Sequence, residues 1–312
     1  MLPLKTIVLG TALSAAMATT ALAADPESCK AVRFSDVGWT DITATTATAS
    51  VVLTALGYEP TTQVLSVPVT YASLKSGDID VFLGNWMPTM EADIAPYRED
   101  KSVETLVTNL EGAKYTLAVP KHTYEAGLKD FADIAKFKDK LGNKIYGIEA
   151  GNDGNRLIQG MIDEDKFGLK GFELVESSEA GMLSAVSKAA SGKEDVVFLG
   201  WEPHPMNANI EMAYLSGGDD VFGPNFGGAT VATNVRAGYA TQCPNVGKLL
   251  TQMVFSLKME NEIMGAILND GKAPEDAAKA WLKANPDAMT PWLAGVTTLD
   301  GKDGPEAVKA AL

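Results

Sequence analysis

The sequence has 312 residues, of which 46% are hydrophobic and 21% are charged, a composition that excludes a disordered or collagen-like chain. There are 26 lysine and arginine residues against 40 aspartate and glutamate residues, so the formal charge is −14, with no long basic run. Because phosphate binding needs clustered basic side chains, nucleic acid is excluded as an expected partner. Two histidines and two cysteines leave little material for a transition-metal site, so no metal or cofactor is expected.

The first 23 residues carry the pattern of a secretory signal peptide. Lys5 supplies the positive charge, residues 7–16 form a short apolar segment, and residues 21–23 read Ala-Leu-Ala, an A-x-A cleavage site. The apolar segment is too short and too rich in alanine and threonine for a membrane-spanning helix. We therefore expect cleavage after Ala23 and export of a soluble product.

Export allows a disulfide bond, and Cys29 and Cys243 are the two cysteines of the chain. Two free buried thiols are the alternative. A bond between Cys29 and Cys243 would close a loop of more than 200 residues. The loss of chain entropy in the unfolded state would then stabilise the protein by roughly 4–5 kcal/mol.

Short strands alternate with helices along the chain. A strand within 32–41 ends in a polar loop before a helix start at 40–46, and a strand within 144–155 repeats this order before a helix start at 153–158. Other strands are expected at 81–83, 103–110, 114–120, 196–199, 210–216 and 229–239, and helices at 244–270 and 274–284. This alternation indicates βαβ units and mostly parallel sheets.

Two stretches of the sequence resemble each other. Residues 74–88 read LKSGDIDVFLGNWMP and residues 189–203 read AASGKEDVVFLGWEP, each with a helix end, Ser-Gly, an acidic residue, a buried strand and then Gly, Trp and Pro. The repeat predicts an α/β protein with two lobes, each a mostly parallel sheet flanked by helices. Lobe 1 would comprise 24–112 and 219–312, and lobe 2 would comprise 113–218, with two crossover strands as the hinge. Both cysteines would then lie in lobe 1.

Aromatic residues follow the predicted strands. Trp39, Trp86 and Trp201 lie just after apolar strands, and Tyr115 opens the strand that enters lobe 2. Ligands of open α/β sheets bind beyond the carboxyl ends of the strands. Core packing explains one such tryptophan well enough. Two tryptophans at matching positions of the repeat, together with a third on a neighbouring loop, favour instead a cleft lined by indole rings.

The charges on the same loops indicate the kind of ligand. Their only basic residue is Arg156, and their other polar residues are acids and amides: Asp36, Asp41, Asn85, Glu149, Asn152, Asp153 and Glu202. An acidic, aromatic pocket suits a quaternary ammonium ion, which has no N–H to donate and is held by ring faces and shape. Asp41, two residues after Trp39, is the best-placed carboxylate.

Catalytic and metal-binding patterns are weak. Glu202 and His204 could belong to an acid/base or metal site, but the other histidine, His122, lies on a different predicted segment. A surface or hinge position therefore fits His204 better. The sequence also contains no Gly-x-Ser-x-Gly motif of a hydrolase.

Six motifs covering essentially the whole mature chain give the sequence a family resemblance: FSDVGWTD (34–41), VFLGNWMPTM (81–90), GAKYTLAVP (112–120), YGIEAGNDGNRLI (146–158), VFLGWEPHPMNAN (197–209) and AAKAWLKANP (277–286). The sequence resembles the periplasmic substrate-binding proteins of ABC importers for quaternary amines, the choline binders more closely than the glycine betaine binders. The resemblance implies the type II periplasmic-binding-protein fold. It also implies an aromatic box with two polar partners of choline: Trp39, Trp86, Tyr115 and Trp201, with Asp41 and Asn152.

This resemblance implies a monomeric, non-catalytic protein of the periplasm that delivers its ligand to a membrane permease. Choline is favoured over glycine betaine, because Asp41 would repel the carboxylate of betaine, whereas a hydroxyl can donate to Asp41 and accept from Asn152. Acetylcholine could enter a roomier cleft. The competing class is a periplasmic enzyme acting on a choline ester, and a sensor linked to a chemoreceptor would share the same fold and pocket.

Overall fold

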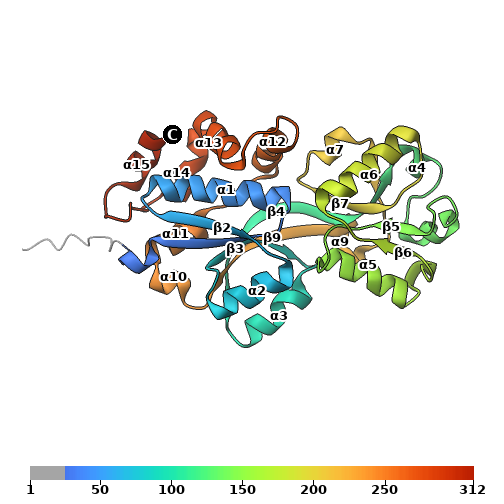
Figure 1. The fold of residues 1–312 in the computed structure, drawn as a ribbon, viewed down its shortest axis with the longest axis horizontal. Helices are drawn as coiled ribbons and strands as arrows, with labels where there is room; N and C mark the ends of the chain where they lie inside the picture. The colour runs from blue at the N-terminus through green and yellow to red at the C-terminus, as the bar shows by residue number, and fades with distance from the viewer. Residues whose placement is uncertain (1–24) are drawn as a thin grey trace, which may run out of the picture.

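The computed structural model of the protein describes residues 25–312, so the predicted signal peptide and its cleavage site lie outside the described residues. Figure 1 shows an elongated molecule with strands and helices gathered at two ends and long strands passing between them. No helix within 25–312 is both long enough and apolar enough to cross a membrane.

The strands of the described residues form one sheet in the order β2-β1-β3-β9-β4-β7-β5-β6, with β8 pairing onto β4. They are β1 (Ala31–Asp36), β2 (Glu59–Val64), β3 (Val81–Met87), β4 (Val103–Pro120), β5 (Lys144–Tyr146), β6 (Glu173–Val175), β7 (Phe198–Glu202), β8 (Met212–Tyr214) and β9 (Gly228–Arg236). The outer strands pair in parallel, β1 with β2 and β3, and β5 with β6 and β7. Strands β4 and β9 pair antiparallel with their neighbours.

Helices cover both faces of the sheet (Figure 1). They are α1 (Thr40–Ala55), α2 (Val67–Ser76), α3 (Glu91–Glu99), α4 (Lys121–Glu125), α5 (Asp153–Asp163), α6 (Glu179–Gly192), α7 (Met206–Asn209), α8 (Asp219–Phe222), α9 (Pro224–Gly227), α10 (Tyr239–Gln242), α11 (Pro244–Gln252), α12 (Leu257–Leu268), α13 (Pro274–Ala284), α14 (Met289–Trp292) and α15 (Gly304–Ala311). We call β1–β3 with α1–α3 and α10–α15 the first half of the molecule, and β5–β8 with α4–α7 the second half.

Two predicted segments differ from the structure. The two strands expected at 103–110 and 114–120 are one strand, β4, which continues through Gly112 at a φ of 75° with shifts in its register against β9. The helical stretch expected at 244–270 is broken between α11 and α12, where Ser256 caps α12 by accepting from the backbone N–H of Met259 at 3.2 Å. The helix expected at 274–284 begins and ends as predicted.

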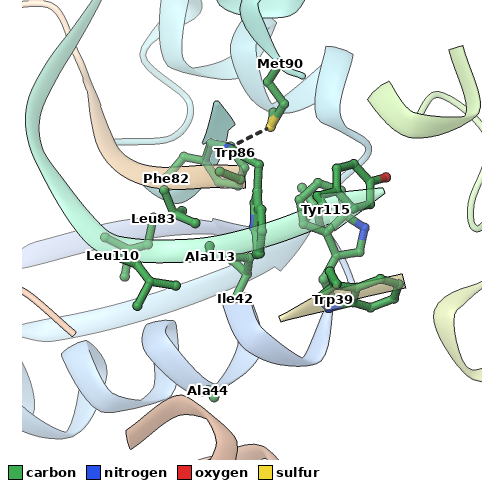
Figure 2. Close-up of a cluster of buried hydrophobic side chains, with 14 of the residues drawn as sticks. Trp39, Ile42, Ala44, Phe82, Leu83, Trp86, Met90, Leu110, Ala113 and Tyr115 are labelled. Atoms are coloured by element: carbon green, nitrogen blue, oxygen red, sulfur yellow. Dashed lines mark hydrogen bonds between the residues drawn. The ribbon is translucent and has the colours of Figure 1, made fainter. Parts of the chain in front are cut away.

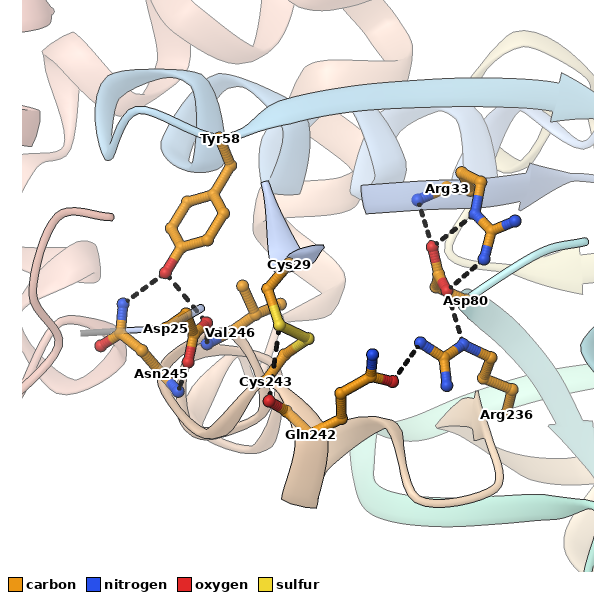
Figure 3. The surroundings of a disulfide bond; sticks show 10 residues. All are labelled: Asp25, Cys29, Arg33, Tyr58, Asp80, Arg236, Gln242, Cys243, Asn245 and Val246. Atoms are coloured by element: carbon orange, nitrogen blue, oxygen red, sulfur yellow. Dashed lines mark hydrogen bonds and ion pairs between the residues drawn. A yellow bond between two sulfur atoms is a disulfide. The ribbon is translucent and has the colours of Figure 1, made fainter. Parts of the chain in front are cut away.

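Cys29 and Cys243 form a disulfide bond, with their Cα atoms 5.7 Å apart, so the predicted pairing is confirmed (Figure 3). Next to it, Asp25 accepts hydrogen bonds from the backbone N–H groups of Asn245 and Val246 at 2.7 and 3.0 Å. The bond and these contacts attach the segment before β1 to the start of α11, far along the chain. The residues just before β1 are therefore held against residues from the last third of the chain, within the first half of the molecule.

Candidate functional site

A small cavity of about 260 Å³, counting the part that opens to solvent, lies between the two halves. It is lined by eight residues: Trp39, Asp41, Trp86, Tyr115, Ile148, Asn152, Asp153 and Trp201. The structure thus brings together all six residues that the sequence predicted as a site. We call these eight residues the cage.

Most cage residues come from the ends of strands and the beginnings of helices, whereas Tyr115 lies within β4. Trp39 and Asp41 lie at the start of α1, and Trp86 lies on β3. Tyr115 on β4 and Trp201 on β7 are direct partners in the antiparallel register. The remaining residues, Ile148, Asn152 and Asp153, lead into α5. The internal repeat therefore places matching loops on opposite sides of one cavity.

The aromatic rings are inclined to one another rather than stacked. The centroids of Trp86 and Tyr115 are 5.9 Å apart with an interplanar angle of 57°, and those of Tyr115 and Trp201 are 6.4 Å apart at 77°. Figure 2 shows Trp39, Trp86 and Tyr115 gathered beside β4 and the start of α1. The rings therefore do not stack on one another, and a cation is attracted to the face of an aromatic ring rather than to its edge.

Hydrogen bonds fix three of these rings. The indole N–H of Trp86 donates to Oδ2 of Asp41 at 3.0 Å, and the indole N–H of Trp39 donates to Oε1 of Glu149 at 2.8 Å. The hydroxyl of Tyr115 donates to Oδ1 of Asn152 at 3.0 Å. Because the single N–H of each of these indoles is already bonded, Trp39 and Trp86 offer a ligand their π faces rather than a donor.

Local backbone features place the Tyr115 ring against α5. Asn152 is the N-cap of α5, and its Oδ1 also accepts from the backbone N–H of Asn155 at 3.0 Å. Two residues on, a Cβ at Gly154 would lie 2.0 Å from the hydroxyl oxygen of Tyr115. Only glycine leaves room there for the phenol to reach its partner on the cap.

Two carboxyl groups of the cage are buried and incompletely bonded. Asp41 is 1% exposed, and its Oδ1 has no hydrogen-bond partner; burial, with the charge of nearby Glu179, raises its pKa to about 8. Asp153 is 0% exposed, and its Oδ2 has no partner; burial, with the charge of Asp93, raises its pKa to about 7. None of the eight cage residues is lysine or arginine. The cavity therefore favours a cation and offers no charged partner to an anion.

Polar contacts join the halves beside the cage. Glu179 of α6 accepts from the backbone N–H of Thr40 at 2.9 Å and also from its hydroxyl, and Nε2 of His204 lies 3.2 Å from the same carboxylate. On another side, Arg156 of α5 binds both carboxylate oxygens of Asp93 on α3 at 2.8 and 2.9 Å. These contacts link the two halves in the arrangement that encloses the cavity.

We expected His204 at the surface or at the hinge; it is 2% exposed, so the surface alternative is wrong. Its ring packs against that of Trp201 with centroids 5.0 Å apart and supports the cage from behind. Four of the acidic and amide loop residues lie outside the cage lining: Glu149, which accepts from Trp39, and three others. Asp36 accepts from the backbone N–H of Gly38 and from the hydroxyl of Thr43 on α1, Asn85 accepts from Tyr71, and Glu202 lies near Lys114.

Ile148 was missed as a lining residue by the sequence argument. An apolar residue after a strand looks the same in a sequence whether it packs in the core or faces a cavity. Asp153 and Glu149 were recognised only as acidic loop residues, and Glu179 was not recognised, because its partner Thr40 is 139 positions away. A search for acids at helix starts in both halves would have found Asp153.

Over residues 30–284 the chain matches the family described as the substrate binding domain of ABC-type glycine betaine transport systems (OpuAC). It is 71% identical to the solved structure of an ABC-transporter choline binding protein in complex with choline, with a TM-score of 0.91 over 92% of this chain and 99% of that one. An unliganded semi-closed structure, also of an ABC-transporter choline binding protein and likewise 71% identical, gives 0.84 over 91% and 99%.

A more distant match is lactococcal OpuAC in its closed form with glycine betaine. This chain is 26% identical to it, with a TM-score of 0.76 over 84% of this chain and 99% of that one. At equal sequence identity, the present structure is thus more similar to the choline complex than to the unliganded semi-closed form. The halves of this chain are therefore arranged more as in the choline complex than as in the unliganded semi-closed form.

Proposed function

Since the chain belongs to the family of substrate-binding domains of ABC-type glycine betaine transport systems, we propose that its cage binds choline for delivery to the membrane permease of an ABC importer. The observation that carries the proposal is the composition of the cage, in which four aromatic rings and two carboxyl groups line one small cavity without a lysine or arginine. The 71% identity to a protein solved in complex with choline supports it.

The trimethylammonium group of choline matches the cage chemically. It has no N–H, so ring faces and nearby negative charge are the interactions that can recognise it. Each cation–π contact contributes roughly 0.5–2 kcal/mol, so four rings supply about 2–8 kcal/mol as an upper sum. Micromolar affinity needs about 8 kcal/mol. A carboxylate is therefore required as well, and the unpartnered Oδ1 of Asp41 is suited to that role.

The hydroxyl of choline finds complementary partners in the same cavity. Asn152 uses its Oδ1 for Tyr115 and Asn155 and one amide N–H for Asp153, which leaves its second N–H to donate to a ligand. Oδ1 of Asp41 can accept a hydrogen bond from the choline hydroxyl group. We therefore assign the ligand-binding role to Trp39, Asp41, Trp86, Tyr115, Asn152 and Trp201.

The strand pairing supports closure of two lobes around the ligand. Residues 103–114 of β4 pair with β9, and residues 114–118 pair with β7, so one strand serves both halves. We assign 24–112 and 219–312 to lobe 1 and 113–218 to lobe 2, with β4 and β9 as the hinge. A ligand that contacts both lobes stabilises the closed form by its differential affinity for that form.

We further propose that residues 1–23 are a signal peptide cleaved after Ala23, and that the mature protein works as a monomer in the periplasm without catalytic activity. The matched family and the solved relatives named above are transport binding proteins. Mass spectrometry of the exported protein tests the cleavage site. Incubation with acetylcholine and a product assay tests the absence of choline ester hydrolysis.

The cage is tested by replacing its rings. Trp86→Ala and Trp201→Ala should each weaken choline binding by at least about tenfold, because each removes a cation–π contact and lets water into the cavity. Trp281→Ala is the matched control, since Trp281 lies on α13 and donates to Glu262 rather than lining the cavity. Calorimetry with choline, glycine betaine and acetylcholine side by side measures the effect.

Wild-type affinity for choline in both cage variants would overturn the site. A wild-type protein that binds glycine betaine tightly and choline weakly or not at all would overturn the ligand.

A further inference from the structure

Trp86 of the cage is bound by a sulfur atom from outside the cage. Its backbone N–H donates to Sδ of Met90 at 3.2 Å, the contact drawn as a dashed line in Figure 2. Met90 is 0% exposed and does not line the cavity. A buried methionine commonly fills a gap in a core, so a sulfur in hydrogen-bond contact with the main chain of a cage residue requires an explanation.

The position of Trp86 on β3 leaves its N–H in need of an acceptor. In the sheet, β3 lies between β1 and β9, and β1 pairs with it at Val81 and Phe82, well before Trp86. The end of β3 that carries Trp86 extends past these pairs and is accompanied by β9 on its other edge. Because a buried backbone N–H without a partner is costly, the sulfur of Met90 takes the place of a strand carbonyl there.

Met90 binds both backbone groups of Trp86. Its own backbone N–H donates to the carbonyl of Trp86 at 2.9 Å, while its sulfur accepts from the N–H. The hydroxyl of Thr89 adds a longer hydrogen bond, at 3.3 Å, to the same carbonyl. At the far end of the side chain, the indole N–H donates to Asp41. The direction of the ring face in the cavity therefore depends on the contacts that fix the main chain of Trp86.

The second half of the molecule holds its own cage tryptophan in a comparable way with a different group. The side-chain amide of Asn207 donates to the carbonyl of Trp201 at 2.8 Å. Asn207 lies in α7, which follows β7, and Met90 is the N-cap of α3, which follows β3. In each half, a side chain at the helix after the strand binds the main chain of the tryptophan near the strand end. This agreement supports a role in the site rather than in filling the core.

We propose that Met90 is a positioning residue of the cage, whose sulfur, by accepting from the backbone N–H of Trp86, sets the direction in which the indole face meets the quaternary ammonium group. This inference rests on the proposed function. A cation is attracted to the face of a ring within about 6 Å of its centroid, so a small displacement of the ring weakens the contact.

The test compares Met90→Leu with Met264→Leu. Leucine fills a similar volume but offers no acceptor, and Met264, on α12, is also 0% exposed but lies outside the cage lining. Calorimetry should show about three- to tenfold weaker choline binding in Met90→Leu and a change within about twofold in Met264→Leu, with similar melting temperatures. Hydrogen exchange of the Trp86 backbone amide, followed by NMR, should be faster in Met90→Leu and unchanged in Met264→Leu.

Norleucine provides a second measurement should Met90→Leu fold poorly, because it keeps the length of methionine and replaces the sulfur by a methylene group. Wild-type protein with norleucine at its methionine positions should bind choline as weakly as Met90→Leu. Selenomethionine, whose selenium can still accept, should leave the affinity unchanged. Norleucine introduced into Met90→Leu should cause no further loss.

Each other outcome has a definite meaning. Equal choline affinities of Met90→Leu and Met264→Leu, or unchanged exchange of the Trp86 amide, overturn the inference, because a methionine that only fills space would behave in that way. Wild-type affinity of the norleucine protein overturns it as well. A wild-type protein that does not bind choline would instead overturn the proposed function, and the exchange measurement would still show whether the sulfur holds the Trp86 amide.

Discussion

Two buried aspartates of this protein stand in opposite surroundings. Asp80, which precedes β3, is 2% exposed and accepts from the backbone N–H, Nε and Nη2 of Arg33 at 3.0, 2.8 and 2.7 Å and from Nε of Arg236 at 2.7 Å (Figure 3). Asp41 in the cage is 1% exposed, has one hydrogen bond from Trp86 and no basic partner in the cavity.

The difference appears in their ionisation. Burial alone would raise the pKa of Asp80, but the hydrogen bonds from Arg33 and Arg236 outweigh it and hold the pKa below its usual value. Burial raises the pKa of Asp41 to about 8 with no such compensation. The first carboxylate therefore serves the fold by joining residues of β1 and β9, whereas the second is left for a ligand to complete.

The comparison predicts that Asp80→Asn is the more damaging change to stability. It leaves two arginines facing a neutral amide, and we expect a loss of about 2–3 kcal/mol of unfolding free energy, reduced from the value for a fully buried pair because both arginines are partly exposed. Choline affinity should stay within about twofold, since Asp80 is outside the cage. Denaturant unfolding and calorimetry measure the two effects.

Asp41→Asn provides the contrast, with unchanged or higher stability and at least about tenfold weaker choline binding. Equal destabilisation by Asp80→Asn and Asp41→Asn would contradict the distinction between the two sites.

The same comparison predicts opposite responses to pH. Asp80 has a lowered pKa in the folded state, so its contribution to stability is present above the unfolded value near 3.8 and is lost as the pH falls through the folded value. Asp41 and Asp153 have raised pKa values of about 8 and 7, so the empty closed protein loses stability as the pH rises from about 4 to 8.

A bound cation favours the ionised carboxylate, so choline binding should release protons near neutral pH, and the affinity should rise with pH up to about 8. Calorimetry in buffers of different ionisation enthalpy counts the released protons. Asp41→Asn should reduce both the proton release and the pH dependence. A pH-independent affinity in the wild-type protein would show that the cage acids are already ionised before binding.

The cage could be predicted from the sequence because the two repeated segments place a tryptophan at the same position after a strand. Trp86 and Trp201 follow equivalent strands, and tryptophan in a polar loop needs an apolar partner. The pairing of Cys29 with Cys243 required no geometry, because the chain has no other cysteine. Local patterns of this kind are visible without knowledge of the fold.

Features that depend on distant partners were not predictable in this way. His204, between β7 and α7, is buried beside Glu179 on α6 and the ring of Trp201. The continuity of β4 through Gly112 depends on its pairing with β9, more than 100 positions later in the chain. A glycine in a left-handed conformation usually indicates a turn, and here the neighbouring strand overrides that local preference.

The smallest predicted effect concerns the ion pair between Arg156 and Asp93, which joins the halves outside the cage. The arginine side chain is 40% exposed, and an ion pair of that kind contributes about 0.2–1 kcal/mol. Because the pair links α5 to α3 across the two halves, it stabilises the closed arrangement of the halves relative to an open one and does not stabilise the fold of either half. Arg156→Gln should therefore weaken choline binding up to about fivefold, through faster dissociation, and leave the melting temperature of the ligand-free protein nearly unchanged.

Lys136→Gln is the matched control for Arg156→Gln. Its pair with Asp133 is of similar length, at 2.7 Å, but lies within one half, so removing it should change neither affinity nor dissociation rate. Stopped-flow fluorescence of the cage tryptophans follows the dissociation directly. Equal effects of the two substitutions would mean that the Arg156–Asp93 pair acts as an ordinary surface ion pair and that closure depends on the ligand and on the contact between Glu179 and Thr40.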